Sequence, residues 1–154
     1  SKIIHNSVNF KQIIKKSNEK IKSSLFKKKT LIKIISVGRL TKQKNHINLL
    51  RAINELKKKE NIELVILGSG YEEQKLKNYI KLNSLKKYVK LIGYKKNPFK
   101  YIKHSNVLIL SSEFEGSPNI LLEAACLKKL IISSDCKTGP KKFYPMEKEG
   151  ICIK

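Results

Sequence analysis

The most informative acidic residues lie in a stretch of the chain that contains no base. Residues 107–127 include no lysine or arginine, although 34 of the 154 residues are basic. This stretch carries three glutamates without a basic neighbour in the sequence: Glu113, Glu115 and Glu123. Carboxylates accept hydrogen bonds from sugar hydroxyls, and the free amides at a helix start bind phosphate. The stretch could therefore bind both ends of a sugar nucleotide.

The local pattern indicates how these glutamates would be placed. Ser117 and Pro118 are typical of a helix start, and the free amides of that helix would point back towards Glu115. Glu123 follows Glu115 at a distance of about 12 Å if every step is helical, so both can border one cleft. The spacing fits equally well a solvated loop acid at 115 and a surface helix residue at 123.

A second pattern follows the first apolar run. Gly38 and Arg39 come directly after this run, and Lys44 follows a few residues later. Gly38 would let the backbone approach a ligand closely, and two cations before a helix start suit a phosphate or diphosphate. Most lysines of so basic a chain are better interpreted as solvated surface. Arg39 differs because the chain has only one other arginine, Arg51. No glycine-rich dinucleotide loop or Walker-type phosphate loop follows any apolar run.

The remaining candidate residues are less specific. Gly68-Ser69-Gly70 and Gly93-Tyr94 each follow an apolar run; either could be a tight turn, and Tyr94 could flank a base. The three histidines lack the spacing of metal ligands, and the three cysteines form no C-x-x-C pair. We therefore expect no metal, no disulfide framework, and a reduced, cytoplasmic protein.

The elements that would position these residues alternate along the chain. Short runs of Ile, Leu and Val predict strands at 31–37, 63–67, 89–92, 106–110, 130–133 and 151–153. Apolar residues at helical spacing predict helices at 45–58, which Asn45 would cap, and at 71–83, with shorter helices starting at Asn97-Pro98 and Ser117-Pro118. This alternation predicts an α/β fold: a Rossmann-like, doubly wound parallel sheet with helices on both faces.

Length and charge limit the organisation and the partners. The chain suffices for one packed domain, and we expect a connector over residues 1–30 and the domain over 31–154, both ends being cut from a longer chain. The formal net charge is +22, but only two of the 34 bases are arginines. Nucleic-acid sites favour arginine, so the basicity permits a polyanion partner without demonstrating one. We expect neither a membrane-spanning helix nor a signal peptide.

Three groups of residues together resemble a known family. They are Gly38-Arg39-Leu40 with Gln43-Lys44-Asn45, the run from Glu115 to Ala124, and Ser134-Asp135-Cys136 with Thr138-Gly139-Pro140. These residues resemble the group 1 (family 4, GT4) retaining glycosyltransferases, from about residue 4 to the end, over their C-terminal, nucleotide-sugar-binding domain. The resemblance implies one half of a GT-B fold, in which two Rossmann-like halves hold the donor between them.

The resemblance also implies roles for the site residues. Arg39 and Lys44 would bind the donor diphosphate and stabilise its charge as it leaves, while Glu115 would face the donor sugar near the reacting carbon. Glu123 would hydrogen-bond the ribose, and Tyr94 would lie near the base. The remaining donor-binding positions would be Gly38, Gly116, Ser117, Pro118 and Asn119. Such enzymes usually work without a bound metal or other cofactor, because the cations and the helix terminus replace it electrostatically.

The partners implied by the resemblance are a nucleotide-sugar donor and a glycan or lipid-linked acceptor. The donor would be UDP-linked and carry an N-acetylhexosamine, and the product would be a polysaccharide made at the cytoplasmic face of a membrane. Lysines near anionic lipid would contribute on the order of 1 kcal/mol each to peripheral binding. The family's acceptor-binding N-terminal half is absent from these 154 residues. We therefore expect this piece alone to bind donor weakly and to transfer nothing.

Departures from the family pattern leave two alternatives open. Lys141 and Lys142 stand where the family often has an acid after its Gly-Pro, and residues 127–129 replace a small-residue turn. One alternative is a basic nucleic-acid-binding module that relies on the charge of +22. The other is a nucleotide-sugar epimerase on the same scaffold, which the glutamates do not exclude but the Gly38-Arg39-Leu40 loop disfavours.

Overall fold

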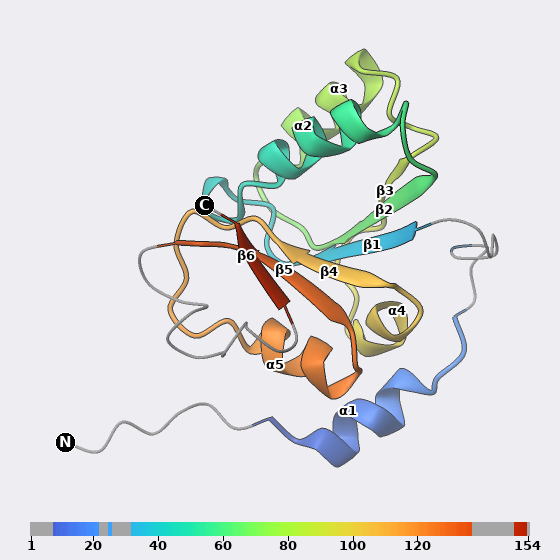
Figure 1. Ribbon diagram of the computed structural model, residues 1–154, viewed down its shortest axis with the longest axis vertical. Coiled ribbons are helices and arrows are strands. Elements are labelled where there is room, and N and C mark those ends of the chain that lie inside the picture. The colour runs from blue at the N-terminus through green and yellow to red at the C-terminus, as the bar shows by residue number, and fades with distance from the viewer. Residues whose placement is uncertain (1–7, 22–24, 26–31, 137–149, 154) are drawn as a thin grey trace.

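The computed structural model describes residues 8–21, 25, 32–136 and 150–153, and its centre is a parallel sheet (Figure 1). The strands are β1 (Ile32–Val37), β2 (Ile62–Leu67), β3 (Val89–Leu91), β4 (Val107–Leu110), β5 (Leu130–Ser134) and β6 (Gly150–Ile153). Their order across the sheet is β3-β2-β1-β4-β5-β6, and every neighbouring pair is parallel. In the register, Ile34 of β1 lies opposite Leu64 of β2 and Val107 of β4.

Helices cover both faces of this sheet. They are α1 (Phe10–Ser17), α2 (His46–Leu56), α3 (Glu73–Leu82), α4 (Phe99–Lys103) and α5 (Asn119–Cys126), with a short 3₁₀ helix at Lys42–Lys44. In Figure 1, α2 and α3 lie on one side of the sheet, and α1, α4 and α5 lie on the other. This arrangement confirms the predicted doubly wound α/β fold.

Alternating strand residues divide the core into two apolar layers. Leu64 and Ile66 pack with α2 and α3, whereas Val65 and Leu67 pack with α4 and α5. All six residues of β2 are buried. Both faces of the central strands are thus covered, which explains why their sequences are continuous apolar runs and do not alternate with polar residues.

The first helix was missed by the sequence analysis, which treated residues 1–30 as a connector. In α1, Asn9 at the N-cap accepts a hydrogen bond from the amide of Gln12 at 3.0 Å. The helix buries Ile13 and Ser17 and packs against α4 and α5. The interspersed lysines obscure its apolar positions, but the N-cap asparagine followed by Ile13 and Ser17 at helical spacing is the signal that could have found it.

The predicted helix caps at Asn45 and Ser117 differ in their outcome. Asn45 occupies the predicted N-cap position of α2, but it has a left-handed φ of 45° and its side chain makes no capping bond. Ser117 does not cap α5. Pro118, with ψ of 88°, occupies the N-cap position, and the helix begins at Asn119.

Candidate functional site

The candidate site lies where the chain order across the sheet reverses. From β1 the chain continues to β2 on one side, while β4 pairs with β1 on the other side. The loops that follow β1 and β4 therefore leave the same edge of the sheet side by side. In open α/β sheets this crevice at the carboxyl ends of the strands is where ligands bind.

Hydrogen bonds hold these two loops together. The amide of Glu113 donates to the carbonyl of Gln43 at 2.9 Å, and the side-chain amide of Gln43 donates to the carbonyl of Phe114 at 3.0 Å. The hydroxyl of Ser111 donates to the carbonyl of Lys44 at 2.9 Å. The β1 and β4 loops therefore form one surface, although about 70 residues separate them in the sequence.

A buried ion pair joins the same loops. Lys44 Nζ donates to Glu115 Oε1, and the Ser112 hydroxyl donates to the same oxygen at 2.5 Å. Glu115 is only 6% exposed and Ser112 is buried. Burial, reinforced by the nearby Glu115 carboxylate, raises the pKa of the Cys136 thiol, so the segment after β5 also borders this pair. Lys44 is thus held in place by Glu115.

Beside the ion pair lies a cavity of about 430 Å³ at the edge of the sheet. Arg39, Glu123 and Tyr94, from three different segments, line this cavity together. The remaining lining residues are Val37, Gly38, Leu67, Gly68, Ser69, Lys95, Lys96, Pro98 and Phe99. An arginine, a carboxylate and an aromatic ring around one cavity can bind an anion, a hydroxyl and a flat ring respectively.

Glu123 is the fifth of the eight residues of α5 and is partly buried. Burial raises the pKa of its carboxyl group above the ordinary value. No cation is among the causes of that shift, in contrast to the close pairing of Glu115 with Lys44. Glu123 is therefore suited to accept hydrogen bonds from a neutral hydroxyl group of a ligand.

Two glycines allow the loops after β1 and β2 to touch. A Cβ on Gly68 would lie 1.8 Å from the carbonyl oxygen of Gly38, and one on Gly70 would lie 2.3 Å from that of Leu40. The amide of Leu40 donates to the carbonyl of Ser69 at 2.9 Å across this contact. The Gly68-Ser69-Gly70 motif therefore supports the backbone around Arg39, and the tight-turn interpretation alone does not explain it.

His46 is a buried imidazole next to the site loop. It is 2% exposed, and its Nδ1 is one of two buried side-chain polar atoms without a partner among the residues that the structure describes; the other is Thr41 Oγ1. Burial and the nearby charge of Lys44 lower the pKa of His46 to about 4. The ring is therefore neutral at physiological pH.

The predicted site residues thus divide into two groups. Gly38, Arg39, Tyr94 and Glu123 line the cavity, whereas Lys44 and Glu115 form the adjacent ion pair and do not line it. Glu115 and Glu123 were predicted to border one cleft, but only Glu123 is among the residues that line this cavity. Four further predicted positions lie between Glu115 and Glu123 in the sequence and are not among the cavity-lining residues: Gly116, Ser117, Pro118 and Asn119.

Sequence reasoning missed Ser112, Lys95 and Lys96. Ser112 precedes Glu115 by three residues, a spacing that could have indicated its bond to the carboxylate. Lys95 and Lys96 directly follow Tyr94, but so many lysines are present that their position alone carried no signal. Within the described residues, no three His, Cys, Asp or Glu side chains cluster as metal ligands, and no helix is long and apolar enough to cross a membrane.

A doubly wound sheet with a cavity at its switch point is typical of ligand-binding α/β domains, nucleotide-binding domains among them. The family model for glycosyl transferases group 1 matches residues 17–154. The chain belongs to this family.

Curated relatives share most of this chain but are much longer. A glycosyltransferase of Methanocaldococcus jannaschii whose own function is uncharacterized is 39% identical over 93% of this chain and 36% of the relative. The N-acetylgalactosamine-N,N'-diacetylbacillosaminyl-diphospho-undecaprenol 4-alpha-N-acetylgalactosaminyltransferase of Campylobacter jejuni is 34% identical over 98% of this chain and 39% of the relative. The chain therefore spans less than two fifths of the length of these relatives.

Solved glycosyltransferase structures have the same fold. The pneumococcal O-GlcNAc transferase GtfA, in complex with UDP and GlcNAc, matches with a TM-score of 0.73 and 26% identity over 80% of this chain and 24% of that chain. The lipopolysaccharide outer core galactosyltransferase WaaB, in its apo form, matches with a TM-score of 0.72 and 27% identity over 82% of this chain and 37% of that chain. The chain is thus one half of a GT-B fold.

Proposed function

We propose that this chain is the donor-binding part of a glycosyltransferase that moves a sugar from a nucleotide-sugar to a glycan or lipid-linked acceptor, with retention of configuration. The observation that carries this proposal is the cavity shared by Arg39, Tyr94 and Glu123 at the switch point of the sheet. A nucleotide-sugar presents a diphosphate, hydroxyl groups and a base, and these three side chains match those three chemistries. The GtfA structure, which contains UDP and GlcNAc, supports the same class of ligand.

The donor is proposed to be UDP-linked and to carry an N-acetylhexosamine. Support comes from the relative of Campylobacter jejuni, whose name describes an N-acetylgalactosaminyltransferase acting on a diphospho-undecaprenol substrate. The Staphylococcus aureus relative described as a poly(ribitol-phosphate) alpha-N-acetylglucosaminyltransferase is 30% identical over 70% of this chain. Both names point to acetylated amino sugars. By the same analogy the acceptor is a surface glycan or its lipid-linked precursor, on the cytoplasmic side.

In this proposal the two cations have different tasks. Arg39 lines the cavity and would bind the diphosphate directly through charge-assisted hydrogen bonds. Lys44 is held by Glu115, so its charge would stabilise the leaving diphosphate from a fixed position. Glu115 would then face the donor sugar, Glu123 would accept a hydrogen bond from the ribose, and the backbone amides of Gly116, Ser117 and Asn119 would contact sugar and phosphate. No metal is needed in this scheme, because the cations supply the positive charge.

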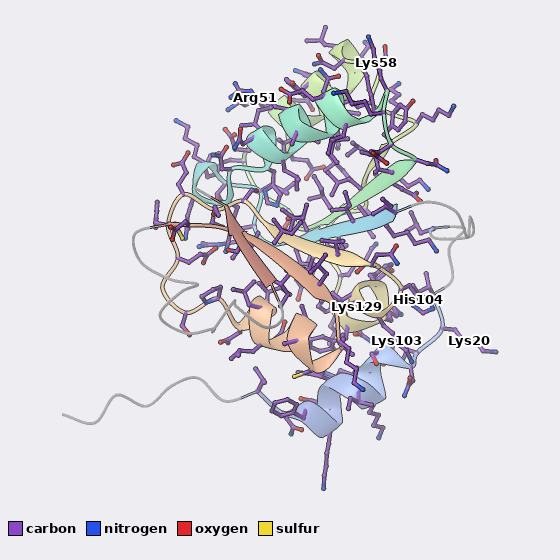
Figure 2. All side chains as sticks on the ribbon, viewed as in Figure 1. Lys20, Arg51, Lys58, Lys103, His104 and Lys129 are labelled. Atoms are coloured by element: carbon purple, nitrogen blue, oxygen red, sulfur yellow. The ribbon has the colours of Figure 1, made fainter. Side chains whose placement is uncertain are left out.

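Loss of Arg39 tests the proposal most directly. We expect Arg39→Ala to weaken UDP binding by roughly 1.5–3 kcal/mol, because a charge-assisted hydrogen bond is lost from the cavity. Isothermal titration calorimetry measures this change. Arg51→Ala is the matched control: Arg51 is the only other arginine, is exposed on α2, and lies away from the site loops (Figure 2).

The panel of ligands decides between this proposal and the alternatives. Titration of the parent chain with UDP, GDP and their sugars should raise its melting temperature for at least one ligand. If none does, the donor-binding function is wrong. Salt-steep binding to RNA or DNA that survives Arg39→Ala would instead favour the nucleic-acid module. Conversion of the bound donor to its epimer would favour the epimerase.

A further inference from the structure

Helix α1 is attached to the domain by one face. Ile13 and Ser17 are buried against α4 and α5. Asn97, in the loop before α4, donates from its side chain to the carbonyl of Lys16 at 2.9 Å. Lys103 at the end of α4 donates to the side-chain oxygen of Asn18. These contacts fix the orientation of α1, so its opposite face is presented outward in a defined way.

The exposed part of α1 combines apolar and cationic groups. Phe10 is 60% exposed and Ile14 is 50% exposed; they lie one helical turn apart and border the buried positions 13 and 17. Lys11 and Lys15 are also exposed and lie beyond this pair, on the half of the helix opposite the buried positions. We call Phe10, Lys11, Ile14 and Lys15 the α1 face.

Further bases gather beside this helix. Lys20, Lys103, His104 and Lys129 lie together at the α1 and α4 side of the molecule, whereas Arg51 and Lys58 lie at the opposite end (Figure 2). Burial, and secondly the charge of Lys103, lower the pKa of Lys129. Residues 8–21 contain one acid, Glu19, which lies 3.6 Å from Lys100. An external anionic surface would relieve the repulsion among these lysines.

We propose that the α1 face binds the surface of an anionic phospholipid bilayer. An amphipathic helix with apolar side chains beside lysines lies in the plane of such a surface, where the apolar groups enter the acyl boundary and the lysines meet lipid phosphates. The adjacent bases disfavour a second copy of this chain as the partner, because two such cationic faces repel each other. Nucleic acid would contact the lysines but would leave Ile14 exposed to water.

The position of α1 connects this surface to the candidate site. Lys16 of α1 lines a cavity of about 370 Å³, and that cavity shares Lys95 and Lys96 with the cavity of the candidate site. A domain held on the bilayer by the α1 face would keep the candidate site beside the lipid surface. This last step rests on the proposed function, since it would serve a lipid-linked acceptor, whereas bilayer binding itself does not depend on it.

A single tryptophan can report on insertion, because the chain contains none. We expect Phe10→Trp to show a blue-shifted emission with vesicles of phosphatidylcholine and phosphatidylglycerol, and quenching by brominated acyl chains. Leu82→Trp, at the 82% exposed last position of α3, should show neither effect. Ile14→Trp provides a second reporter if Phe10→Trp lowers the stability measured by circular dichroism. Vesicle binding without a shift at either position would overturn the proposal.

Charge-matched variants separate the α1 face from the overall charge of +22. Lys11→Gln with Lys15→Gln should weaken binding to the anionic vesicles by about fivefold per lysine, measured by co-sedimentation. Lys58→Gln with Lys59→Gln has the same net charge and should change binding much less, because Lys58 lies at the far end of the molecule (Figure 2) and Lys59 follows it directly in the chain. The proposal would be refuted if both pairs of substitutions caused equal losses of binding, or if the chain bound pure phosphatidylcholine equally well. It would also be refuted if the chain self-associated through Phe10 without binding vesicles.

Discussion

The protonation state of His46 is determined by its burial beside the site loop. Its ring is buried, its Nδ1 has no partner within the described part of the chain, and the Lys44 ammonium lies nearby. Lys44 cannot move away, because it is paired with Glu115. The native state therefore favours the neutral imidazole of His46 over the protonated one.

Stability should consequently fall at acid pH because of His46. Its pKa is about 4 in the folded chain and 6.5 in the unfolded chain, so the unfolded state binds more protons between these values. The free energy of unfolding should therefore decrease by up to about 3 kcal/mol from this residue alone as the pH falls through that range, and should be constant in this respect above it. Urea unfolding of the parent and of His46→Asn between about pH 7 and about pH 4.5 measures the difference.

The exposed His104 provides the control for this comparison. His104→Asn should retain the pH dependence of the parent, whereas His46→Asn should lose the corresponding part of it. Identical pH profiles for the parent and His46→Asn would contradict the assignment of this pH dependence to the buried ring.

At the same scale, the sequence could indicate Arg39 and Glu123 but not the pairing of Lys44 with Glu115. Arg39 was conspicuous because arginine is scarce, and Glu123 because bases are missing around it. The ion pair depends on β1 and β4 being neighbours in the sheet, which no local pattern reports. Lys44 is one of 32 lysines, and its pairing with the loop residue Glu115 can be inferred only once the long-range strand pairing is known.

At the scale of the elements, the loops after β1 and β2 act as one support for the arginine. Gly70 has no room for a side chain, since a Cβ would lie 2.3 Å from the Leu40 carbonyl oxygen. That carbonyl also accepts a hydrogen bond from the amide of Glu72 at 3.0 Å. The two loops therefore cannot separate without losing backbone hydrogen bonds on both sides.

Gly70→Ala should accordingly destabilise the chain by about 1–3 kcal/mol, as overpacking does, and should weaken UDP binding by displacing the Arg39 loop. Gly116→Ala is the matched control for the unfolding measurement alone, because no atom lies within 4 Å of its Cβ position. Urea unfolding measures the first effect and calorimetry the second. A Gly70→Ala variant as stable as Gly116→Ala would show that the loop contact is not as tight as the geometry indicates.

Regular elements were predicted well wherever their apolar residues form a continuous run or a clear stripe at helical spacing. Every predicted strand is present within two residues of its expected ends over the described positions, and so are α2 and α3. The failures involve α1, whose single buried stripe is interrupted by lysines, the capping bond that the Asn45 side chain does not make, and Ser117, which is not the N-cap of α5. Caps depend on backbone angles set by the preceding turn, which residue type alone does not determine.

At the scale of the whole molecule, the charge of +22 is distributed unevenly over the fold. The stretch from β4 through α5, residues 107–127, carries no base and contributes Glu115 and Glu123 to the two parts of the site. The lysines beside α1 lie on the helical layer made by α1, α4 and α5. The acidic stretch and the lysines beside α1 therefore lie in different parts of the fold, which explains why overall basicity does not identify the ligand.

The isolated 154-residue chain should bind UDP but show no sugar transfer. In a GT-B fold the donor lies between two halves, and this chain spans less than two fifths of its relatives. One half alone leaves the donor exposed to water and lacks the groups that would position an acceptor, so the transition state is not stabilised. Release of UDP from UDP-N-acetylglucosamine and UDP-N-acetylgalactosamine, with a lipid-linked glycan present, measures turnover.

Binding of UDP to the same preparation is the necessary control, since it separates an incomplete site from an unfolded one. Arg39→Ala should lose this binding while the parent retains it, with turnover absent in both. Turnover by the parent above the rate of Arg39→Ala would show that residues 1–154 already contain all the catalytic groups. The second half of the fold would then serve acceptor choice and not the chemical step.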